Sequence, residues 1–279
     1  MIEVKDFTFK YKEGQNPAIK DVNITIPDGT FVGITGAAGS GKSTLTYALN
    51  GIIPHCYPGE FYGSVMIEGL DSVEASLTDI SRFVGSVCQD VDSQMVSSIV
   101  EDEMLYGLEN FSVPRDEIAS RVSEALDLLG IADLRDRRID SLSGGQKQKV
   151  AIAAIIALKP KVLVLDEPTA ELDPSSSLSV FRILADYARE YKTTVIVVEQ
   201  KIALLSQFCD KLIIVDDGTI AYDDAPREVL RHADELLEIG VNCPRSTTLV
   251  NTLRELDLYS GAAVCSVDEA FEVIKEVCA

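Results

Sequence analysis

An apolar segment, a glycine-rich stretch and a helical pattern follow one another early in the chain. TFVGIT at 30–35 runs directly into GAAGSGKS at 36–43, and TLTYALNGII follows with helical spacing. The eight central residues fit G-x-x-x-x-G-K-[ST], and a strand before and a helix after are the context in which such a loop binds phosphate. A chance match is the alternative, and these flanking patterns argue against it. The stretch predicts a nucleotide site at the end of a strand.

The chemistry of this loop follows from its residue types. Glycines allow a tight turn whose backbone N–H groups converge on phosphate oxygens at the positive end of the next helix. We expect Lys42 to reach the β- and γ-phosphates and the Ser43 hydroxyl to ligate Mg²⁺. The residues predicted here to bind ATP are Gly36, Ala37, Ala38, Gly39, Ser40, Gly41, Lys42, Ser43 and Thr44.

Other segments predict a mainly parallel sheet. KVLVL at 161–165, TTVIVV at 193–198 and KLIIV at 211–215 are almost wholly apolar and alternate with helical patterns, which is typical of strands covered on both faces. Earlier β-rich segments lie at 2–11 and 18–26, and shorter strands are expected at 65–67 and 84–88. From about Ala225 the strand signal ends and short helices are expected, the last begun by Ser266 with Glu269.

Two carboxylates follow the strand KVLVL. Asp166 would lie at the carboxyl end of a buried strand, where α/β sheets bind ligands, and a Mg²⁺–nucleotide complex would give it a partner. Glu167 could polarise a water beside the γ-phosphate. The alternative, that both residues merely enter a loop, weakens once the upstream glycine loop is considered.

The stretch LSGGQ at 142–146 has two interpretations. Ser143 and Gln146 form the S-x-x-Q pattern of a capping box, which would start a helix that runs through Leu158. A cap alone does not explain Gly144 and Gly145, because glycine costs helix stability, whereas small residues at a helix N-terminus let a phosphate approach closely. The chain thus has two candidate anion sites and one lysine-bearing loop.

Composition limits the class of protein. The 279 residues carry 45 acidic and 25 basic side chains, a net charge of −20 that disfavours nucleic acid and bare anionic membrane as partners. The excess of acidic side chains either forms a solvated surface or forms a patch that binds a basic partner. The N-terminus lacks the apolar core of a secretory signal, and the longest apolar run, VAIAAIIAL, is far short of the roughly 20 residues that span a bilayer. We expect a soluble or peripheral protein.

The cysteines and histidines show no metal-binding pattern. The six cysteines lie at 56, 88, 209, 243, 265 and 278 without C-x-x-C spacing, and neither His55 nor His232 is clustered with them. We expect free thiols in the cytosol, acting as small core residues, and no structural metal.

Taken in order, the glycine loop, LSGGQ and LVLDEPTAELD resemble the nucleotide-binding subunit of an ABC transporter over roughly residues 2–224. The resemblance implies an α/β fold of the P-loop NTPase type, with a mostly parallel sheet, an antiparallel β subdomain and a helical subdomain at about 89–158, in a domain spanning 1–224. It also implies a head-to-tail dimer in which the LSGGQ of one chain, with Ser143, Gly144, Gly145 and Gln146, closes over the nucleotide of the other.

The same resemblance assigns three further residues. Tyr11 is the aromatic that stacks on adenine, Gln89 ligates Mg²⁺ together with Ser43 and Asp166, and Asp173 couples the two sites across the dimer. Each also has a local interpretation. Tyr11 could be a strand surface residue, Gln89 a turn residue and Asp173 the N-cap before Pro174, and for Asp173 both can hold.

The segment QDVDSQMVSSIVEDEMLYGLEN, residues 89–110, is similar to the energy-coupling factor (ECF) type of vitamin and metal importers, in which a second glutamine, here Gln94, opens a short helix. The tail ELLEIGVNCPRSTTLVNTLREL, residues 235–256, is also similar to their small helical C-terminal dimerisation domain, expected at 225–279. In that family arginine-bearing coupling helices of a membrane subunit dock nearby. The acidic patch would then consist of Asp90, Asp92, Glu101, Asp102 and Glu103.

The strand TTVIVV ends in Glu199–Gln200, and here the chain departs from the family. Most ABC ATPases have a histidine at the position of Gln200, in contact with the γ-phosphate and the Glu167-type carboxylate. A glutamine amide still donates a hydrogen bond, but it cannot titrate or carry charge. Either the site hydrolyses ATP slowly and the chain pairs with a paralogue that keeps the histidine, or Gln200 suffices as a positioning group beside the base Glu167.

The leading function is therefore ATP hydrolysis that powers import, at the cytoplasmic face of a membrane. The implied partners are a second ATPase subunit, a membrane coupling subunit and a solute-binding membrane subunit. One alternative is a weakly catalytic nucleotide-binding partner of a paralogous ATPase. A soluble ABC ATPase of DNA repair or the ribosome is less favoured, because the chain has one glycine loop, no sustained heptads and negative charge. The transported substrate, and whether the dimer is homo- or heteromeric, stay open.

Overall fold

The computed structural model describes residues 1–278. Its strands are β1 (Ile2–Tyr11), β2 (Ile19–Ile26), β3 (Phe31–Thr35), β4 (Gly59–Ile67), β5 (Leu70–Asp71), β6 (Val84–Val87), β7 (Val162–Asp166), β8 (Thr194–Val198), β9 (Lys211–Asp216) and β10 (Thr219–Asp224). Within the described residues they form an antiparallel four-stranded sheet, β2-β1-β4-β5, and a six-stranded sheet, β10-β9-β3-β8-β7-β6. In the larger sheet β10 is antiparallel to β9, and the remaining neighbours are parallel.

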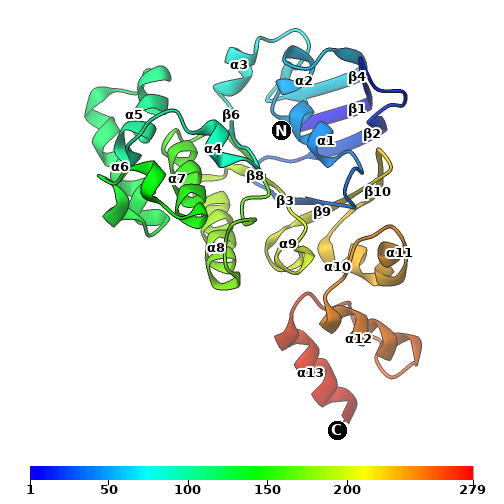
Figure 1. Ribbon diagram of the computed structural model, residues 1–279. Helices are drawn as coiled ribbons and strands as arrows, with labels where there is room; N and C mark the ends of the chain where they lie inside the picture. The colour runs from blue at the N-terminus through cyan, green and yellow to red at the C-terminus, as the bar shows by residue number, and fades with distance from the viewer. Residues whose placement is uncertain (279) are drawn as a thin grey trace.

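Helices surround the larger sheet and form the C-terminal end of the molecule (Figure 1). They are α1 (Lys42–Leu49), α2 (Ile52–His55), α3 (Leu77–Ser81), α4 (Val91–Gln94), α5 (Val100–Asn110), α6 (Arg115–Leu128), α7 (Gly144–Ala157), α8 (Pro174–Tyr191), α9 (Ile202–Phe208), α10 (Pro226–Val229), α11 (Ala233–Glu238), α12 (Arg245–Glu255) and α13 (Val267–Cys278), with 3₁₀ turns at Ala132–Leu134, Ile139–Ser141 and Leu230–His232.

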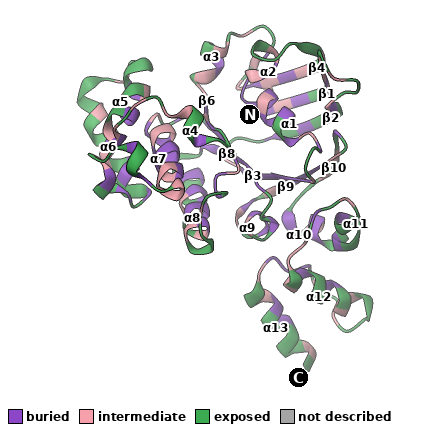
Figure 2. Ribbon diagram, viewed as in Figure 1, coloured by how far each residue is buried: buried purple, intermediate pink, exposed green. Residues whose placement is uncertain are grey.

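The larger sheet separates two hydrophobic cores, and Figure 2 shows its central strands as buried. Because successive strand residues point to opposite faces, Val162 and Val164 of β7 pack in the core that the sheet shares with β1, β2, β4 and α1. Leu163 and Leu165 pack in the core that contains α5 to α9. This two-sided burial is why β3, β7 and β8 are buried along their whole length and almost wholly apolar, and it confirms the predicted α/β fold with a mostly parallel sheet.

The parallel direction of β3, β6, β7 and β8 brings their carboxyl ends to one edge of the sheet. The glycine loop follows β3, and the segments that begin at Cys88, Glu167 and Glu199 follow β6, β7 and β8. Four stretches that are far apart in the sequence therefore meet at this edge.

Several elements differ from the sequence expectations. The strand expected at 65–67 begins at Gly59, because the whole of 59–67 pairs with β1. The helix α5 had no predicted counterpart, and the turn after KLIIV leads into β10 as a hairpin. Gln94 does not open a short helix, as the resemblance implied, but ends α4, whose N-cap is Asp90.

The C-terminal residues divide between two cores. Leu230, Leu236 and Cys265 belong to the main core, whereas Val250, Val264, Ala270 and Val273 of the region around α12 and α13 form a cluster of their own. As expected, the Ser266 hydroxyl accepts a hydrogen bond from the backbone N–H of Glu269 at 3.2 Å. The domain division at residue 225 stays a prediction.

Candidate functional site

The glycine loop turns sharply between β3 and α1. Gly36 has φ 153° and Gly41 has φ 106°, conformations that L side chains rarely adopt. A Cβ on Gly36 would lie 2.1 Å from the carbonyl oxygen of Val215, and one on Gly41 would lie 2.6 Å from that of Ala18. Glycine is therefore required at both positions, and the loop has the compact form that the motif predicts.

The side chain of Lys42 folds back over this loop. Its Nζ donates to the carbonyl oxygens of Gly36 at 2.9 Å and Ala37 at 2.7 Å. Burial lowers the pKa of Lys42, while the negative charges of Glu167 and Asp166 act in the opposite direction. The ammonium group is therefore held next to the loop and the two carboxylates, within reach of an anion that the loop would bind.

Asp166 is the last residue of β7 and is buried. Burial raises its pKa to about 6, the charges of Glu167 and Glu199 add to this rise, and Lys42 opposes it. Burial and neighbouring acids disfavour the ionised form of a carboxylate, and a nearby cation would stabilise that form. Asp166 thus has the properties expected of a metal ligand.

Glu167 lies between two glutamines that come from different strand ends. Gln89 donates from Nε2 to Oε2 of Glu167 at 3.0 Å, and Gln200 donates from Nε2 to Oε1 at 2.7 Å. The backbone of Glu167 has φ 48°, and its N–H donates to the carbonyl of Val198 at 2.8 Å. The structure thus brings Gln89, Glu167 and Gln200 into direct contact, as their predicted places in one site require.

The ring of Tyr11 belongs to an aromatic cluster at the end of β1. It meets Phe9 and Tyr57 edge to face, and Tyr57 stacks on Tyr47 with ring centroids 5.2 Å apart. The Tyr11 hydroxyl shares a 3.1 Å hydrogen bond with Thr44 of α1, so this ring lies beside the helix that follows the glycine loop. Tyr47 and Tyr57 were not predicted as part of the site, because no motif or spacing in the sequence marks them.

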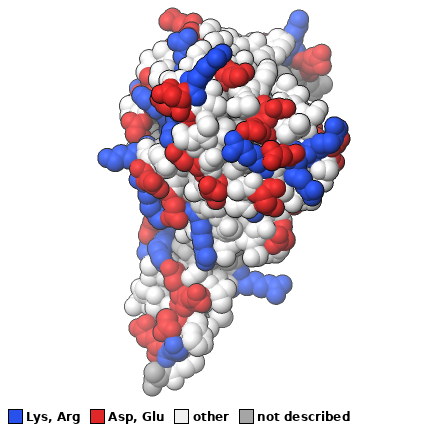
Figure 3. Space-filling model, turned by 90° about the vertical axis from the view of Figure 1, so that its left-hand side faces the viewer, with Lys and Arg blue, Asp and Glu red and all other residues white. Residues whose placement is uncertain are grey.

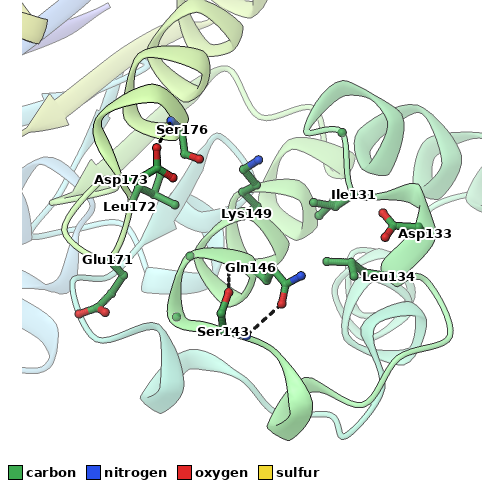
Figure 4. A pocket seen from close by; sticks show the side chains of 13 residues that line it. Ile131, Asp133, Leu134, Ser143, Gln146, Lys149, Glu171, Leu172, Asp173 and Ser176 are labelled. Carbon is green, nitrogen blue, oxygen red and sulfur yellow. Dashed lines mark hydrogen bonds between the residues drawn. The ribbon is translucent and has the colours of Figure 1, made fainter.

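The LSGGQ segment starts α7 through a complete capping box. Ser143 Oγ accepts from the backbone N–H of Gln146 at 3.3 Å, and Gln146 Oε1 accepts from that of Ser143 at 3.0 Å (Figure 4). The capping interpretation is therefore confirmed. It does not account for Gly144 and Gly145, which border a cavity.

The cavity has a volume of about 480 Å³ and opens beside the start of α7 (Figure 4). Its walls come from α7, from the turn after α6 and from the segment after β7, and they include Ser143, Gly144, Gly145, Gln146, Glu171 and Asp173. Asp173 also caps α8, since Oδ1 accepts from the N–H groups of Ser175 at 2.9 Å and Ser176 at 3.0 Å. Hydrogen bonding by Ser176 lowers the pKa of Asp173.

The two candidate anion sites lie apart in the chain. The described residues that line the LSGGQ cavity include none of the glycine loop at 36–43. Figure 1 shows α1 and α7 in different parts of the molecule, with strands of the larger sheet between them. LSGGQ therefore does not complete the glycine-loop site of its own chain.

The predicted acidic patch is wrong in part, because several of its acidic residues bind partners within the chain. Glu103 is 8% exposed and accepts hydrogen bonds from the backbone N–H groups of Val96 and Ser97, so it holds its own loop rather than facing a partner. Glu101 pairs with Arg135, and Asp92 pairs with Lys147. The side on which α5 and α6 lie accordingly shows both signs of charge interspersed (Figure 3).

Gln94 and the cysteines also differ from expectation. Gln94 accepts from Cys88 N at 2.9 Å and donates to Ser86 O at 3.0 Å, so it fixes the end of β6. The cysteines are free thiols, but only part of the set lies in the core. Within residues 1–278, Cys209 and Cys265 are buried, whereas Cys56, Cys88 and Cys278 are exposed.

Comparison with known proteins agrees with this arrangement. A family model described as ABC transporter matches residues 19–170. The chain belongs to the ABC transporter family. A Pyrococcus horikoshii protein with the provisional name of an ABC transporter ATP-binding protein is 39% identical over 275 residues, which are 99% of this chain and 96% of that protein. As an ABC ATPase, the chain binds ATP, and the family implies ATP hydrolysis coupled to transport.

Two further relatives have names that refer to a transporter. The energy-coupling factor transporter ATP-binding protein EcfA2 of Caldanaerobacter subterraneus subsp. tengcongensis is 38% identical over 279 residues, which cover 98% of this chain and 96% of EcfA2. CbiO1 of Clostridium perfringens, described as part of the ABC transporter complex cbiONQ, superimposes with a TM-score of 0.75 and 31% identity, covering 91% of this chain and 98% of CbiO1.

A dimeric structure is also similar. The ATP-binding cassette MJ0796, in a post-hydrolysis state bound to ADP and Pi, superimposes with a TM-score of 0.73 and 28% identity over 81% of this chain and 99% of that one.

Within the described residues of the ABC ATPase, no helix is both long enough and apolar enough to cross a membrane.

Proposed function

We propose that this ABC ATPase hydrolyses ATP to energise an ECF-type importer of a vitamin or metal ion, as one of two cassettes that bind membrane partners at the cytoplasmic face. The observation that carries the proposal is the position of Glu167. Its carboxylate lies between the amides of Gln89 and Gln200, at the sheet edge where β7 ends in Asp166 and near Lys42 at the start of α1. This arrangement fits a group that orients water next to a bound phosphate.

In the proposed reaction the chain's own groups have separate tasks. Backbone N–H groups of residues 36–43, the start of α1 and Lys42 bind the ATP phosphates. Glu167 orients the attacking water and accepts its proton, and Gln89 and Gln200 fix the two oxygens of this carboxylate. Tyr11, beside α1, stacks on the adenine base.

The residues proposed to hold Mg²⁺ fit that ion. Ser43, Gln89 and Asp166 offer a hydroxyl, an amide oxygen and a carboxylate, which are the oxygen ligands that Mg²⁺ prefers. Gln89 uses its nitrogen toward Glu167, which leaves its oxygen for another partner. Bound there, Mg²⁺ would neutralise phosphate charge and the buried charge of Asp166.

The second cassette is proposed because LSGGQ borders a cavity that its own glycine loop does not reach. A head-to-tail partner would bring a nucleotide to Ser143, Gly144, Gly145 and Gln146, with Asp173 next to both sites. The dimeric arrangement of the similar cassette MJ0796 supports this. The partner is either a second copy or a paralogue.

We also propose that residues 225–279 form a dimerisation domain, distinct from the nucleotide-binding domain at 1–224. On α13, Val267 is 74% exposed and Phe271 is 55% exposed, so this helix carries apolar side chains outward in addition to those that it buries. Exposed apolar side chains on one helix are typical of a protein interface.

A neutral amide at position 200 favours slow hydrolysis, with the chain acting as the weaker site beside a paralogue. Gln200 donates to Glu167 but cannot supply positive charge to the γ-phosphate. The test is a Gln200→His variant in the intact complex. We expect faster ATP turnover. Turnover that stays the same in a correctly assembled dimer would instead favour Gln200 as a sufficient positioning group.

The proposed role in import is tested by purification. The chain is tagged in its own cells, membranes are solubilised gently, and co-purifying proteins are identified by mass spectrometry. We expect a membrane coupling subunit, a small solute-binding membrane protein and a second ATPase chain. Recovery from the soluble fraction without a membrane protein would contradict the transport role and leave the nucleotide site intact.

A further inference from the structure

The loop after β8 contains a buried acid that the proposed reaction does not use. Glu199 is 3% exposed. Its Oε1 accepts from the backbone N–H groups of Gln200 at 2.9 Å and Lys201 at 3.3 Å, and its Oε2 accepts from the Thr169 hydroxyl. Both oxygens of the carboxylate are therefore occupied, and one of them holds the backbone of Gln200 directly.

Lys201 approaches the same threonine from the other side. Its Nζ donates to the Thr169 carbonyl at 2.7 Å, to the Thr169 hydroxyl at 3.1 Å and to Ser177 Oγ at 3.2 Å. The Thr169 hydroxyl thus accepts from a cation and donates to an anion, which uses its one donor and one of its two acceptor lone pairs. Such a chain of bonds polarises its members and strengthens each of them.

This network joins three segments around Glu167. Glu199 and Lys201 flank Gln200, whose amide contacts Glu167 at 2.7 Å. Thr169 is fully buried and lies two residues after Glu167. Ser177 lies in the first turns of α8, the helix capped by Asp173 beside the LSGGQ cavity.

A network of this kind adds little to stability alone. Burying a carboxylate costs desolvation energy, and apolar packing of similar volume is often as stable or more so. Buried charges arranged with complete hydrogen bonding are better explained by the geometry that they impose. Here that geometry is the direction of the Gln200 amide.

We propose that Glu199, Thr169 and Lys201 are positioning residues that hold the Gln200 amide against Glu167 and link this contact to the start of α8. The inference rests on the proposed function, because it requires Glu167 to act on water. A displacement at the first turns of α8 reaches Gln200 through Ser177 and Lys201. The hydrolytic group is thereby connected to the part of the chain that borders the LSGGQ cavity.

The test removes one hydroxyl without changing side-chain size. Thr169→Val is compared with Thr169→Ser, which keeps the hydroxyl, in the full chain within its membrane complex. ATP turnover is measured above the background of a Glu167→Gln complex. We expect kcat to fall about tenfold in Thr169→Val with KM for ATP unchanged, and to stay near the wild-type value in Thr169→Ser.

A double-mutant cycle separates positioning from loss of stability. If the network acts through Gln200, Thr169→Val lowers kcat in the wild-type background and has no further effect in Gln200→Ala. Equal effects in both backgrounds would overturn the inference, as would unchanged kcat in Thr169→Val. Glu124→Gln, at an exposed ion pair on α6 with Lys159, serves as the control for thermal stability.

Structure determination gives a readout that does not depend on turnover. In crystals of Thr169→Val we expect the distance from Gln200 Nε2 to Glu167 Oε1 to increase from 2.7 Å to beyond about 3.5 Å. An unchanged distance would overturn the inference.

The proposed function and the positioning network fail in different ways. If Glu167→Gln turns over ATP as fast as the wild type, the proposed function fails. If Glu167→Gln and Gln200→Ala lower turnover but Thr169→Val does not, the role of Glu167 stands and the positioning network is wrong.

Discussion

The glycine loop lies among side chains that its own chain supplies, whereas the LSGGQ segment borders a cavity that its own chain leaves open. Around the first, Lys42 contacts the loop and Glu167 is held by Gln89 and Gln200. Around the second, Ser143 and Gln146 bond to each other, and Gly144 and Gly145 face about 480 Å³ of space. This difference is what the proposed head-to-tail dimer requires: the glycine-loop region would carry the reacting groups, and the LSGGQ region would bind a nucleotide held by a partner cassette.

The largest effect is expected from a substitution beside the glycine loop. Glu167→Gln keeps the size of the side chain and removes its ability to take a proton. We expect kcat to fall by about 10² to 10⁴, the range for loss of a general base, while ATP binding stays near normal. Steady-state turnover and equilibrium ATP binding are measured on the same complex. Exposed Glu124→Gln is the matched control, and equal turnover in both variants would contradict the assignment.

The second largest effect is expected from a substitution in LSGGQ, which leaves the residues around the glycine loop unchanged. Gly144→Asp places a carboxylate at the start of α7, where a negative charge favours the helix but repels a partner's phosphate. Its Cβ meets the exposed side chain of Glu171, at 2.9 Å from Oε2, which can move. We expect hydrolysis by the dimer to fall about tenfold or more.

Binding of ATP to the isolated Gly144→Asp chain should stay unchanged, and its melting temperature should not fall. Loss of ATP binding by that single chain would mean that LSGGQ contributes to its own chain's glycine-loop site, and the contrast between the two regions would disappear.

A pH series tests whether Asp166, beside the glycine loop, is a Mg²⁺ ligand. Asp166 has a pKa raised to about 6, chiefly by burial, and only its ionised form can hold Mg²⁺. As pH falls through 6 the carboxyl group becomes protonated, so we expect Mg²⁺-dependent nucleotide binding to weaken by up to roughly tenfold per pH unit. Titration calorimetry between pH 5 and 8 tests this, and affinity that does not change with pH would count against Asp166 as a ligand.

The smallest expected effect concerns the C-terminal helix. Phe271→Ala removes an exposed aromatic side chain from α13 without disturbing the main core. If α13 contacts the other cassette, we expect association to weaken roughly fivefold, as for an interface residue of moderate importance. Sedimentation velocity on the purified cassettes measures this. Association equal to that of the wild type would place the dimer contacts elsewhere.

Sequence patterns predicted those features of the candidate site that depend on residues close together in the chain. The glycine loop, the strand before Asp166 and the capping box at Ser143 each lie within a few residues, and all are present in the structure. Parallel strands then place their ends together, which brought Gln89, Glu167 and Gln200 into contact.

Contacts that depend on tertiary packing could not be predicted in this way. Glu103 looked like part of a charged run, yet it turns inward to bond Val96 and Ser97. Gln94 ends α4 because its side chain bonds Ser86 and Cys88 at the end of β6. The network of Glu199 and Thr169 joins residues 30 positions apart, and no motif or periodicity marks such a pair.

We propose that a second cassette completes the nucleotide site. Native mass spectrometry of the gently solubilised complex, purified through a tag on this chain, tests it most directly. We expect two cassette chains, either two copies or one copy with a paralogue, together with membrane proteins. A complex that holds a single cassette while it hydrolyses ATP would contradict the claim.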